Sequence, residues 1–280
     1  MRSGGPTMRD TNCPSCGAGQ TAVFRPNMNR CAACGLVWLD EKYSGAPVYE
    51  EGMEKNIYGG GKTALFRRCL KTLAERFPSR GKLLDVGSAY GAFLGLAAAG
   101  GWRAEGVEID ARMSSAAAAA GFKVYNRPLE ELGLPAASYD VVTVFEVLCL
   151  MGDPFRAVKE IHRALKPGGL VYIREFNGAF HLALDGSRIF GALGLRPSVI
   201  HNFNFTAESL RRMLAAAGFR NIKLRNSPPT TGDPYGTGGR LGAALTGLAK
   251  VGYYCAAQLL YFASAGRLLA GSSFIIEAEK

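Results

Sequence analysis

Strand patterns and helix patterns alternate along residues 82–175, and this alternation restricts the possible fold more than any other feature of the chain. Repeated strand–helix units form a mostly parallel sheet with helices on both faces and ligands at the carboxyl ends of the strands. The body of the chain is therefore predicted to be α/β. The strand patterns lie at 83–86, 103–108, 123–125, 139–145 and 170–175, and helical patterns lie at 93–99, 114–120 and 154–165.

Two further strand patterns, at 220–226 and 272–279, extend the sheet and are expected to pair antiparallel. A chain of 280 residues is long enough for one full-sized domain and an accessory module. We place an N-terminal module at 1–44, a linker with a helix at 45–80 and the main domain at 81–280.

Four of the seven cysteines form two C-x2-C pairs near the N-terminus. Each pair is followed by a glycine, Gly17 or Gly35, which tolerates the left-handed backbone that such a turn often needs. Two such turns on a short hairpin predict a tetrahedral zinc ribbon, and four thiolates leave no open position, so the ion is expected to be structural. This use of cysteine favours a reducing compartment, with the cytoplasm as the expected location. The ligands are Cys13, Cys16, Cys31 and Cys34.

A turn made mostly of small residues follows the first strand of the main domain. Asp85 ends that strand, and residues 87–91 form the turn, which allows backbone N–H groups and the next helix N-terminus to approach a ligand. Glu108 ends the second strand, 23 residues after Asp85, where a carboxylate can accept both hydroxyls of a ribose. Together they predict a nucleoside-containing cofactor. The dinucleotide fingerprint is excluded, because Ala89 and Ala92 stand where it needs glycine.

The order of motifs over residues 81–227 resembles that of the class I S-adenosylmethionine-dependent methyltransferases. This resemblance implies a Rossmann-like sheet of seven strands, mostly parallel with the last strand antiparallel, and S-adenosylmethionine as cofactor. The motifs are D-V-G-S-A-Y-G at 85–91, G-V-E-I-D at 106–110, S-Y-D-V-V at 138–142, F-E-V-L at 145–148 and L-K-P-G-G at 165–169.

The resemblance also implies roles for individual residues. Asp85 and the backbone of the turn would hold the methionine moiety, and Glu108 would bind the ribose. The adenine would lie against Ile109, and Tyr90 or Phe145 could offer a ring face to the sulfonium cation. The residues expected at the cofactor are Asp85, Gly87, Ser88, Ala89, Tyr90, Gly91, Glu108, Ile109, Leu129 and Glu130 beside the adenine, and Phe145 and Glu146 at the floor.

The catalytic base is less well defined by the sequence. Cys149 and Leu150 follow the segment in which relatives often have Glu-His. His201 precedes a helix at a place where relatives often carry a histidine facing the acceptor, so it is the candidate acid, base or substrate contact. The alternative is a structural polar group.

Residues 59–63, Gly-Gly-Gly-Lys-Thr, resemble the end of a phosphate-binding P-loop. The full pattern needs a glycine where Asn56 stands and an apolar strand before it, so we reject this interpretation. Apolar residues at helical spacing then predict a helix over 63–77.

A hydrophobic helical insertion is predicted at 228–271. Lys250 and Arg267 are the only charged residues in 241–270, and the uncharged stretch between them is too short to cross a bilayer. A buried core or dimer helix, a lid over an apolar acceptor and a membrane-surface anchor all remain open.

These features predict methyl transfer to a small-molecule or lipid-linked acceptor, with an oxygen as the favoured atom. An RNA or DNA methyltransferase is the alternative, because the ribbon and a net charge of +10 both suit nucleic acid. A catalytically decayed binding scaffold is the second alternative. Peripheral membrane contact or a homodimer through 241–270 also remains open, and a lid or a membrane anchor would fit a lipid-like acceptor.

Overall fold

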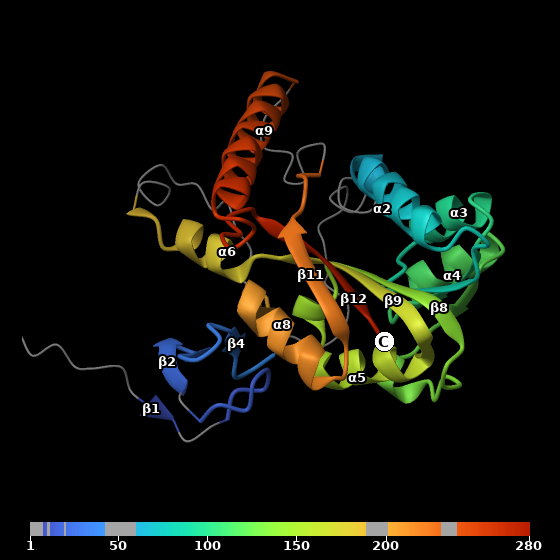
Figure 1. Cartoon of the computed structure of the whole chain (residues 1–280), viewed down its shortest axis with the longest axis horizontal. Coiled ribbons are helices and arrows are strands. Elements are labelled where there is room, and N and C mark those ends of the chain that lie inside the picture. Colours follow the sequence, from blue (N-terminus) through green and yellow to red (C-terminus); the bar gives the residue numbers. More distant parts are fainter. Residues whose placement is uncertain (1–7, 10–11, 20, 43–59, 189–200, 231–239) are drawn as a thin grey trace, which may run out of the picture.

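Seven strands form the central sheet of this computed structural model, which describes residues 8–9, 12–19, 21–42, 60–188, 201–230 and 240–280 (Figure 1). Their order is β11-β12-β9-β8-β5-β6-β7. The expected linker residues 45–59 lie outside the described residues. The strands are β5 (Lys82–Val86), β6 (Arg103–Val107), β7 (Lys123–Tyr125), β8 (Tyr139–Phe145), β9 (Leu165–Phe176), β11 (Arg220–Asn226) and β12 (Ser273–Glu279).

The pairing confirms the predicted direction of the strands. β5 pairs parallel with β6 and β8, β6 with β7, and β8 with β9. The last strand, β12, is antiparallel to both of its neighbours, β9 and β11. The carboxyl ends of β5, β6, β8 and β9 therefore meet at one edge of the sheet.

Helices cover both faces of the sheet, as the strand–helix alternation requires. α2 (Thr63–Arg76) and α3 (Ala92–Ala99) pack on one face in a buried cluster with Leu83 and Val141. α5 (Pro154–Ala164) and α8 (Ala207–Ala216) pack on the other face in a cluster with Leu84 and Val142. Since neighbouring residues of a strand point to opposite faces, the adjacent apolar pairs 83–84 of β5 and 141–142 of β8 each contribute to both cores. The remaining helices are α4 (Ala111–Ala119), α6 (Gly178–Asp185) and α9 (Arg240–Ala263), with short 3-10 turns at Gly60–Lys62, Leu129–Glu131 and Leu148–Leu150.

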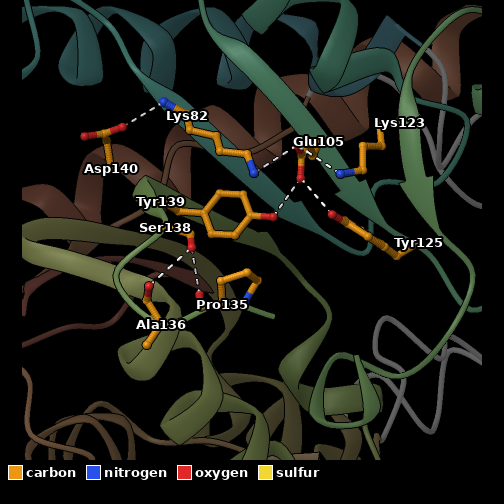
Figure 2. A network of polar contacts seen from close by, with 9 residues as sticks. All are labelled: Lys82, Glu105, Lys123, Tyr125, Pro135, Ala136, Ser138, Tyr139 and Asp140. Atoms are coloured by element: carbon orange, nitrogen blue, oxygen red, sulfur yellow. Dashed lines mark hydrogen bonds and ion pairs between the residues drawn. The ribbon is translucent and has the colours of Figure 1, made fainter. Parts of the chain in front are cut away.

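A polar network joins the amino-terminal ends of β5 to β8 (Figure 2). The carboxylate of Glu105 accepts hydrogen bonds from Tyr139 Oη at 2.7 Å and Tyr125 Oη at 3.1 Å, and lies 3.0 Å from Lys82 Nζ. Burial raises the pKa of Glu105, but the bonds from Tyr139 and Lys82 outweigh it and the net pKa is lowered. This network stabilises the edge of the sheet opposite the carboxyl ends.

The N-terminal module forms a second sheet of order β1-β2-β3-β4-β10. The first four strands are β1 (Met8–Arg9), β2 (Thr21–Arg25), β3 (Met28–Cys31) and β4 (Val37–Leu39). The fifth, β10 (Phe203–Asn204), comes from the main domain and pairs antiparallel with β4, with Phe203 opposite Trp38. The main domain thus completes the sheet of the N-terminal module, a contact that the sequence analysis did not anticipate.

α9 extends away from the central sheet (Figure 1). Leu248, Leu259 and Phe262 on this helix are each 70% exposed or more. The interpretation of the insertion as a buried core helix is therefore wrong for the described side chains, because only Ala257 among them is fully covered. None of the described helices, α9 included, has the length and hydrophobicity of a membrane-crossing helix.

Candidate functional site

The turn after β5 and the carboxylate at the end of β6 converge, as predicted. The backbone N–H of Ala89 donates to Glu108 Oε2 at 2.9 Å. The backbone N–H of Asp110 donates to Glu108 Oε1 at 2.9 Å, and Asn126 Nδ2 donates to the carbonyl of Glu108 at 2.8 Å. Each carboxylate oxygen keeps a second lone pair for a further donor.

The backbone of the turn explains its small residues. Gly87 and Gly91 have φ angles of 78° and 80°, in the left-handed region that favours glycine. A Cβ on Gly87 would lie 2.3 Å from Val147 Cγ2, so a side chain is also excluded by space. Ala89 has φ 46°, so the turn also holds an alanine in the left-handed region. Gly91 is the N-cap of α3, which turns the N–H groups of that helix toward the site.

Asp85 is buried inside the sheet, at 2% exposure. Its Oδ1 accepts a 2.7 Å hydrogen bond from Thr143 Oγ1 on the neighbouring strand β8. Burial raises the pKa of Asp85 to about 7, against the opposing effect of the Thr143 bond. A carboxyl group at this position is thus poised between its two protonation states near neutral pH.

The residues predicted to surround the adenine and the sulfonium occupy different environments. Ile109 is 48% exposed beside Glu108, an unusual position for a large apolar side chain, and Arg112 lies 5.8 Å from the ring of Tyr90. The side chain of Leu129 is buried in the main core, whereas Glu130 is half-buried. The ring of Phe145 packs among other aromatic rings in the core. That aromatic cluster consists of Phe66, Phe93, Phe145 and Tyr172.

Two basic side chains, Lys62 and Arg174, contact Glu146, and neither was predicted from the sequence. Lys62 Nζ lies 2.7 Å from Glu146 Oε2, and Arg174 forms an ion pair with Glu146 Oε1. Burial and, to a smaller extent, the nearby charge of Arg174 lower the pKa of Lys62 to about 8. Glu146 itself has φ 61°, a strained backbone that commonly accompanies a functional position in a non-glycine residue.

Arg174 and Glu175 both lie at the carboxyl end of β9, and both are buried. Glu175 accepts hydrogen bonds from the backbone N–H groups of Cys149 and Phe176, at 3.2 and 2.8 Å. Arg174 Nε donates to Ser227 Oγ at 2.9 Å. Two adjacent charged residues at the end of an apolar strand pattern were the sequence feature that could have identified this cluster.

The predicted acid–base residue, His201, lies at the same edge of the sheet. Its ring stacks on Phe176, which ends β9, with ring centroids 4.9 Å apart and an interplanar angle of 11°. His181 packs edge-on against Phe176 and its Nε2 lies 3.0 Å from the carbonyl of Ser272. Burial lowers the pKa of His201 to about 4, so its imidazole is neutral at physiological pH.

The four cysteines of the N-terminal module form one cluster. Their Sγ atoms all lie within 4.8 Å of one another, and the pairs Cys13–Cys34 and Cys16–Cys31 are each 3.6 Å apart. Tetrahedral zinc with Zn–S bonds of about 2.3 Å places its sulfurs about 3.8 Å apart. The two glycines after the pairs have φ angles of 71° and 73°, which confirms the expected left-handed turns.

This arrangement fits a nucleoside cofactor at the carboxyl ends of β5 and β6. Residues 60–224 match the family model described as "Methyltransferase domain", which covers more than half of the chain. The chain belongs to the methyltransferase-domain family. The prediction of a class I methyltransferase fold with a Rossmann-like sheet is thereby confirmed.

Relatives and solved structures agree with this family. The chain is 27% identical over 113 residues to a "Ubiquinone/menaquinone biosynthesis C-methyltransferase UbiE" of Pseudoalteromonas translucida, and 29% identical over 113 residues to the same-named protein of Idiomarina loihiensis. Each match covers 35% of this chain and 45% of the relative, so the chain spans about half the length of these curated relatives. A SAM-dependent methyltransferase from Archaeoglobus fulgidus has the same fold, with a TM-score of 0.54 and 19% identity over 81% of this chain and 97% of the other.

Proposed function

We propose that this chain transfers the methyl group of S-adenosylmethionine to a small-molecule or lipid-linked acceptor. The observation that carries the proposal is the 2.9 Å hydrogen bond between the Ala89 N–H and the Glu108 carboxylate. This bond brings the small-residue turn and the ribose-type carboxylate to one place at the carboxyl edge of the sheet, where ligands of such folds bind.

The residues at this edge suit each part of the cofactor. Glu108 offers two carboxylate lone pairs to the ribose hydroxyls, and the exposed Ile109 offers an apolar surface to the adenine. Asp85, with the N–H groups of the turn and of α3, suits the methionine end. When bound, the cofactor supplies an electrophilic methyl group on a sulfonium. The protein then has to hold an acceptor atom in line with it, and such positioning contributes several kcal/mol.

An aromatic cluster lies beside the charged group at the carboxyl ends of β8 and β9. Phe176, Phe180 and the two neutral imidazoles of His181 and His201 form one ring cluster there. Because burial lowers the pKa of both histidines, neither adds a positive charge to this surface near neutral pH. This environment favours an uncharged aromatic or lipid-linked acceptor over a phosphate backbone. His201 is proposed as the group that contacts the acceptor.

The acceptor atom that receives the methyl group could be an oxygen or a carbon, and the two alternatives make different demands on the protein. An oxygen acceptor needs a base, and His201 is the nearest neutral imidazole to the end of β9. The curated relatives carry C-methyltransferase in their names, so carbon is the second form. We further propose that the four-cysteine cluster binds one structural zinc ion, since its sulfurs already have the spacing of a tetrahedral site.

The test combines binding and transfer with the full-length protein. Titration calorimetry with S-adenosylmethionine should show one site per chain. The protein is then incubated with methyl-labelled cofactor and three separate acceptor pools: a lipid extract, water-soluble metabolites and total RNA. We expect label in the lipid extract or in the metabolites, and the position of the new methyl group in the product distinguishes oxygen from carbon.

Two outcomes would contradict the proposal. Absence of cofactor binding would favour a decayed scaffold. Label that enters only RNA, with an affinity for RNA that falls steeply with salt, would favour the nucleic-acid enzyme.

A further inference from the structure

Most of the exposed large apolar side chains among the described residues lie on α9 or directly after it. Leu248, Leu259 and Phe262 are 70 to 71% exposed, and Val251 and Leu268 are each 55% exposed. Monomeric soluble proteins rarely keep a contiguous apolar patch of this kind unless it contacts a partner. The exposed apolar side of α9 is therefore expected to contact a partner.

Five exposed residues follow one side of the helix, whereas Leu260, which is 48% exposed, lies off this line. Leu248, Val251, Cys255, Leu259 and Phe262 are spaced three or four residues apart, which aligns them along a single stripe. We call these five residues the apolar stripe.

The opposite side of α9 contacts the body of the protein. Asn226 Nδ2 donates to the carbonyl of Ala257 at 3.1 Å, and the Tyr253 hydroxyl is hydrogen-bonded to Ser272 Oγ. The helix is thus held in a defined orientation, with the apolar stripe facing outward.

The charges of this segment are all of one sign. Residues 234–276 contain Arg240, Lys250 and Arg267 and no aspartate or glutamate. Arg267 is exposed and lies directly beside Leu268. A helix with an apolar side, basic residues and no acidic ones has the composition of helices that lie in the headgroup region of anionic membranes.

A second copy of the chain fits this surface less well. A stable protein interface contains about 20 to 30 residues from each partner, whereas the apolar stripe has five on one helix. Pairing two copies would also bring their basic segments together, with no acidic residue in 234–276 to compensate them.

We propose that α9 docks the protein on an anionic lipid surface, with the apolar stripe in the headgroup boundary and the exposed Arg267 beside lipid phosphates. The inference rests in part on the proposed function, because it explains how a lipid-linked acceptor would reach the site. Ser272 connects the two regions: its hydroxyl bonds Tyr253 of α9, and its carbonyl lies 3.0 Å from Nε2 of His181. A docked helix would therefore hold the acceptor side of the sheet near the membrane.

Vesicle flotation of the full-length protein tests this inference without cofactor or acceptor. Vesicles of phosphatidylcholine with about 30% phosphatidylglycerol are compared with pure phosphatidylcholine, at low and high salt. We expect binding to the anionic vesicles that weakens with salt. L259S/F262S should weaken it about tenfold or more, and R267E about fivefold or more. The matched control is K159E, the same charge reversal at an exposed lysine on α5.

Three results would overturn the inference. Wild type could fail to bind anionic vesicles, or K159E could weaken binding as much as R267E, which would indicate unspecific attraction of a basic protein. Light scattering could instead show a dimer that L259S/F262S converts to monomer, which would assign the apolar stripe to a second copy. Cofactor titration of the same variants should remain unchanged, so failure of docking is distinguishable from failure of the proposed methyl transfer.

Discussion

Lys62 Nζ lies 2.7 Å from Glu146 Oε2, which joins the residue before α2 to the residue after β8. Arg174 contacts the other oxygen of the same carboxylate, so Glu146 is shared between two cations. The side chain of Arg174 is 3% exposed and that of Lys62 is 17% exposed. Because a buried charge that loses its partner is costly, this group makes the carboxyl edge of the sheet sensitive to substitution.

Arg174 and Lys62 should contribute unequally to the free energy of unfolding. R174M removes a fully buried cation, together with its bond to Ser227, and should lower the free energy of unfolding by about 3 to 5 kcal/mol. K62M leaves Glu146 paired with Arg174 and should cost about 1 to 2 kcal/mol. Urea unfolding of both variants measures the difference, and a larger loss in K62M would refute this account.

Glu108 should determine cofactor affinity. E108A removes the carboxylate that accepts the Ala89 N–H of the turn and should weaken S-adenosylmethionine binding about 30- to 100-fold, the cost of two charge-assisted hydrogen bonds. E131A, an exposed glutamate on the short turn after β7, is the matched control and should bind normally. Titration calorimetry gives both constants, and equal affinities would remove Glu108 from the site.

Asp85 should make the protein less stable as pH rises. Its pKa is raised to about 7 in the folded protein against about 3.9 in an unfolded chain, so folding favours the protonated form. Its contribution to stability is complete below about pH 4 and is lost as pH rises to 7. D85N should therefore be more stable than wild type at pH 8, by at most about 4 kcal/mol, and the gap should close toward pH 4. Thermal unfolding across this range tests the trend; a gap that widens at low pH would contradict it.

Loss of one thiolate should release the metal. C34S should reduce the zinc content from one ion per chain to well below that, because three thiolates and a hydroxyl hold zinc poorly. It should also loosen the pairing of β4 with β10. Trp38, opposite Phe203, reports this by fluorescence in a W102F background. C255S, an exposed cysteine on α9, is the control and should keep both the metal and the spectrum.

The burial of His201 should make the folded protein less stable in acid. Its pKa is lowered to about 4, so the unfolded chain binds a proton near pH 6.5 that the folded chain does not. The contribution of His201 to the free energy of unfolding is therefore lost as pH falls from about 6.5 to 4. At pH 5 this loss is about 1 to 2 kcal/mol. H201F keeps the stack on Phe176 and should lose this acid sensitivity. If His201 contacts the acceptor, H201F should also lower kcat while cofactor affinity is unchanged; unchanged kcat would leave it a packing residue.

The elements that sequence patterns predicted well are those whose pattern is local. β7 and β8 have the predicted bounds, and α2 ends one residue earlier than expected. Their apolar residues recur at the strand or helix period within a few positions, and both faces of the sheet are buried. The convergence of Glu108 with the turn was also predictable, because adjacent parallel strands end at one edge.

The features that were missed depend on contacts between distant segments. Lys62 stands 84 residues before Glu146, and its sequence resembled the end of a phosphate loop, whereas the described residues Gly60–Lys62 form a 3-10 turn. β10 has two residues, too few for any periodic pattern, and exists because β4 offers it an edge. α9 is apolar by composition, which is typical of burial, but nothing in its own sequence shows whether another element covers it.

The strand shared between the two sheets has a consequence for how this protein can be divided. Thr206 Oγ1, which caps α8, also donates to the carbonyl of Cys34 at 2.6 Å, and Ser15 Oγ donates to the carbonyl of Ser209 at 2.7 Å. The two cysteine turns therefore help to hold the first turn of α8 in place. Recombination that moved the methyltransferase body elsewhere without residues 12–42 would leave Phe203 uncovered and that helix start unsupported. Deletion of residues 12–42 is therefore expected to destabilise α8 as well as the N-terminal module.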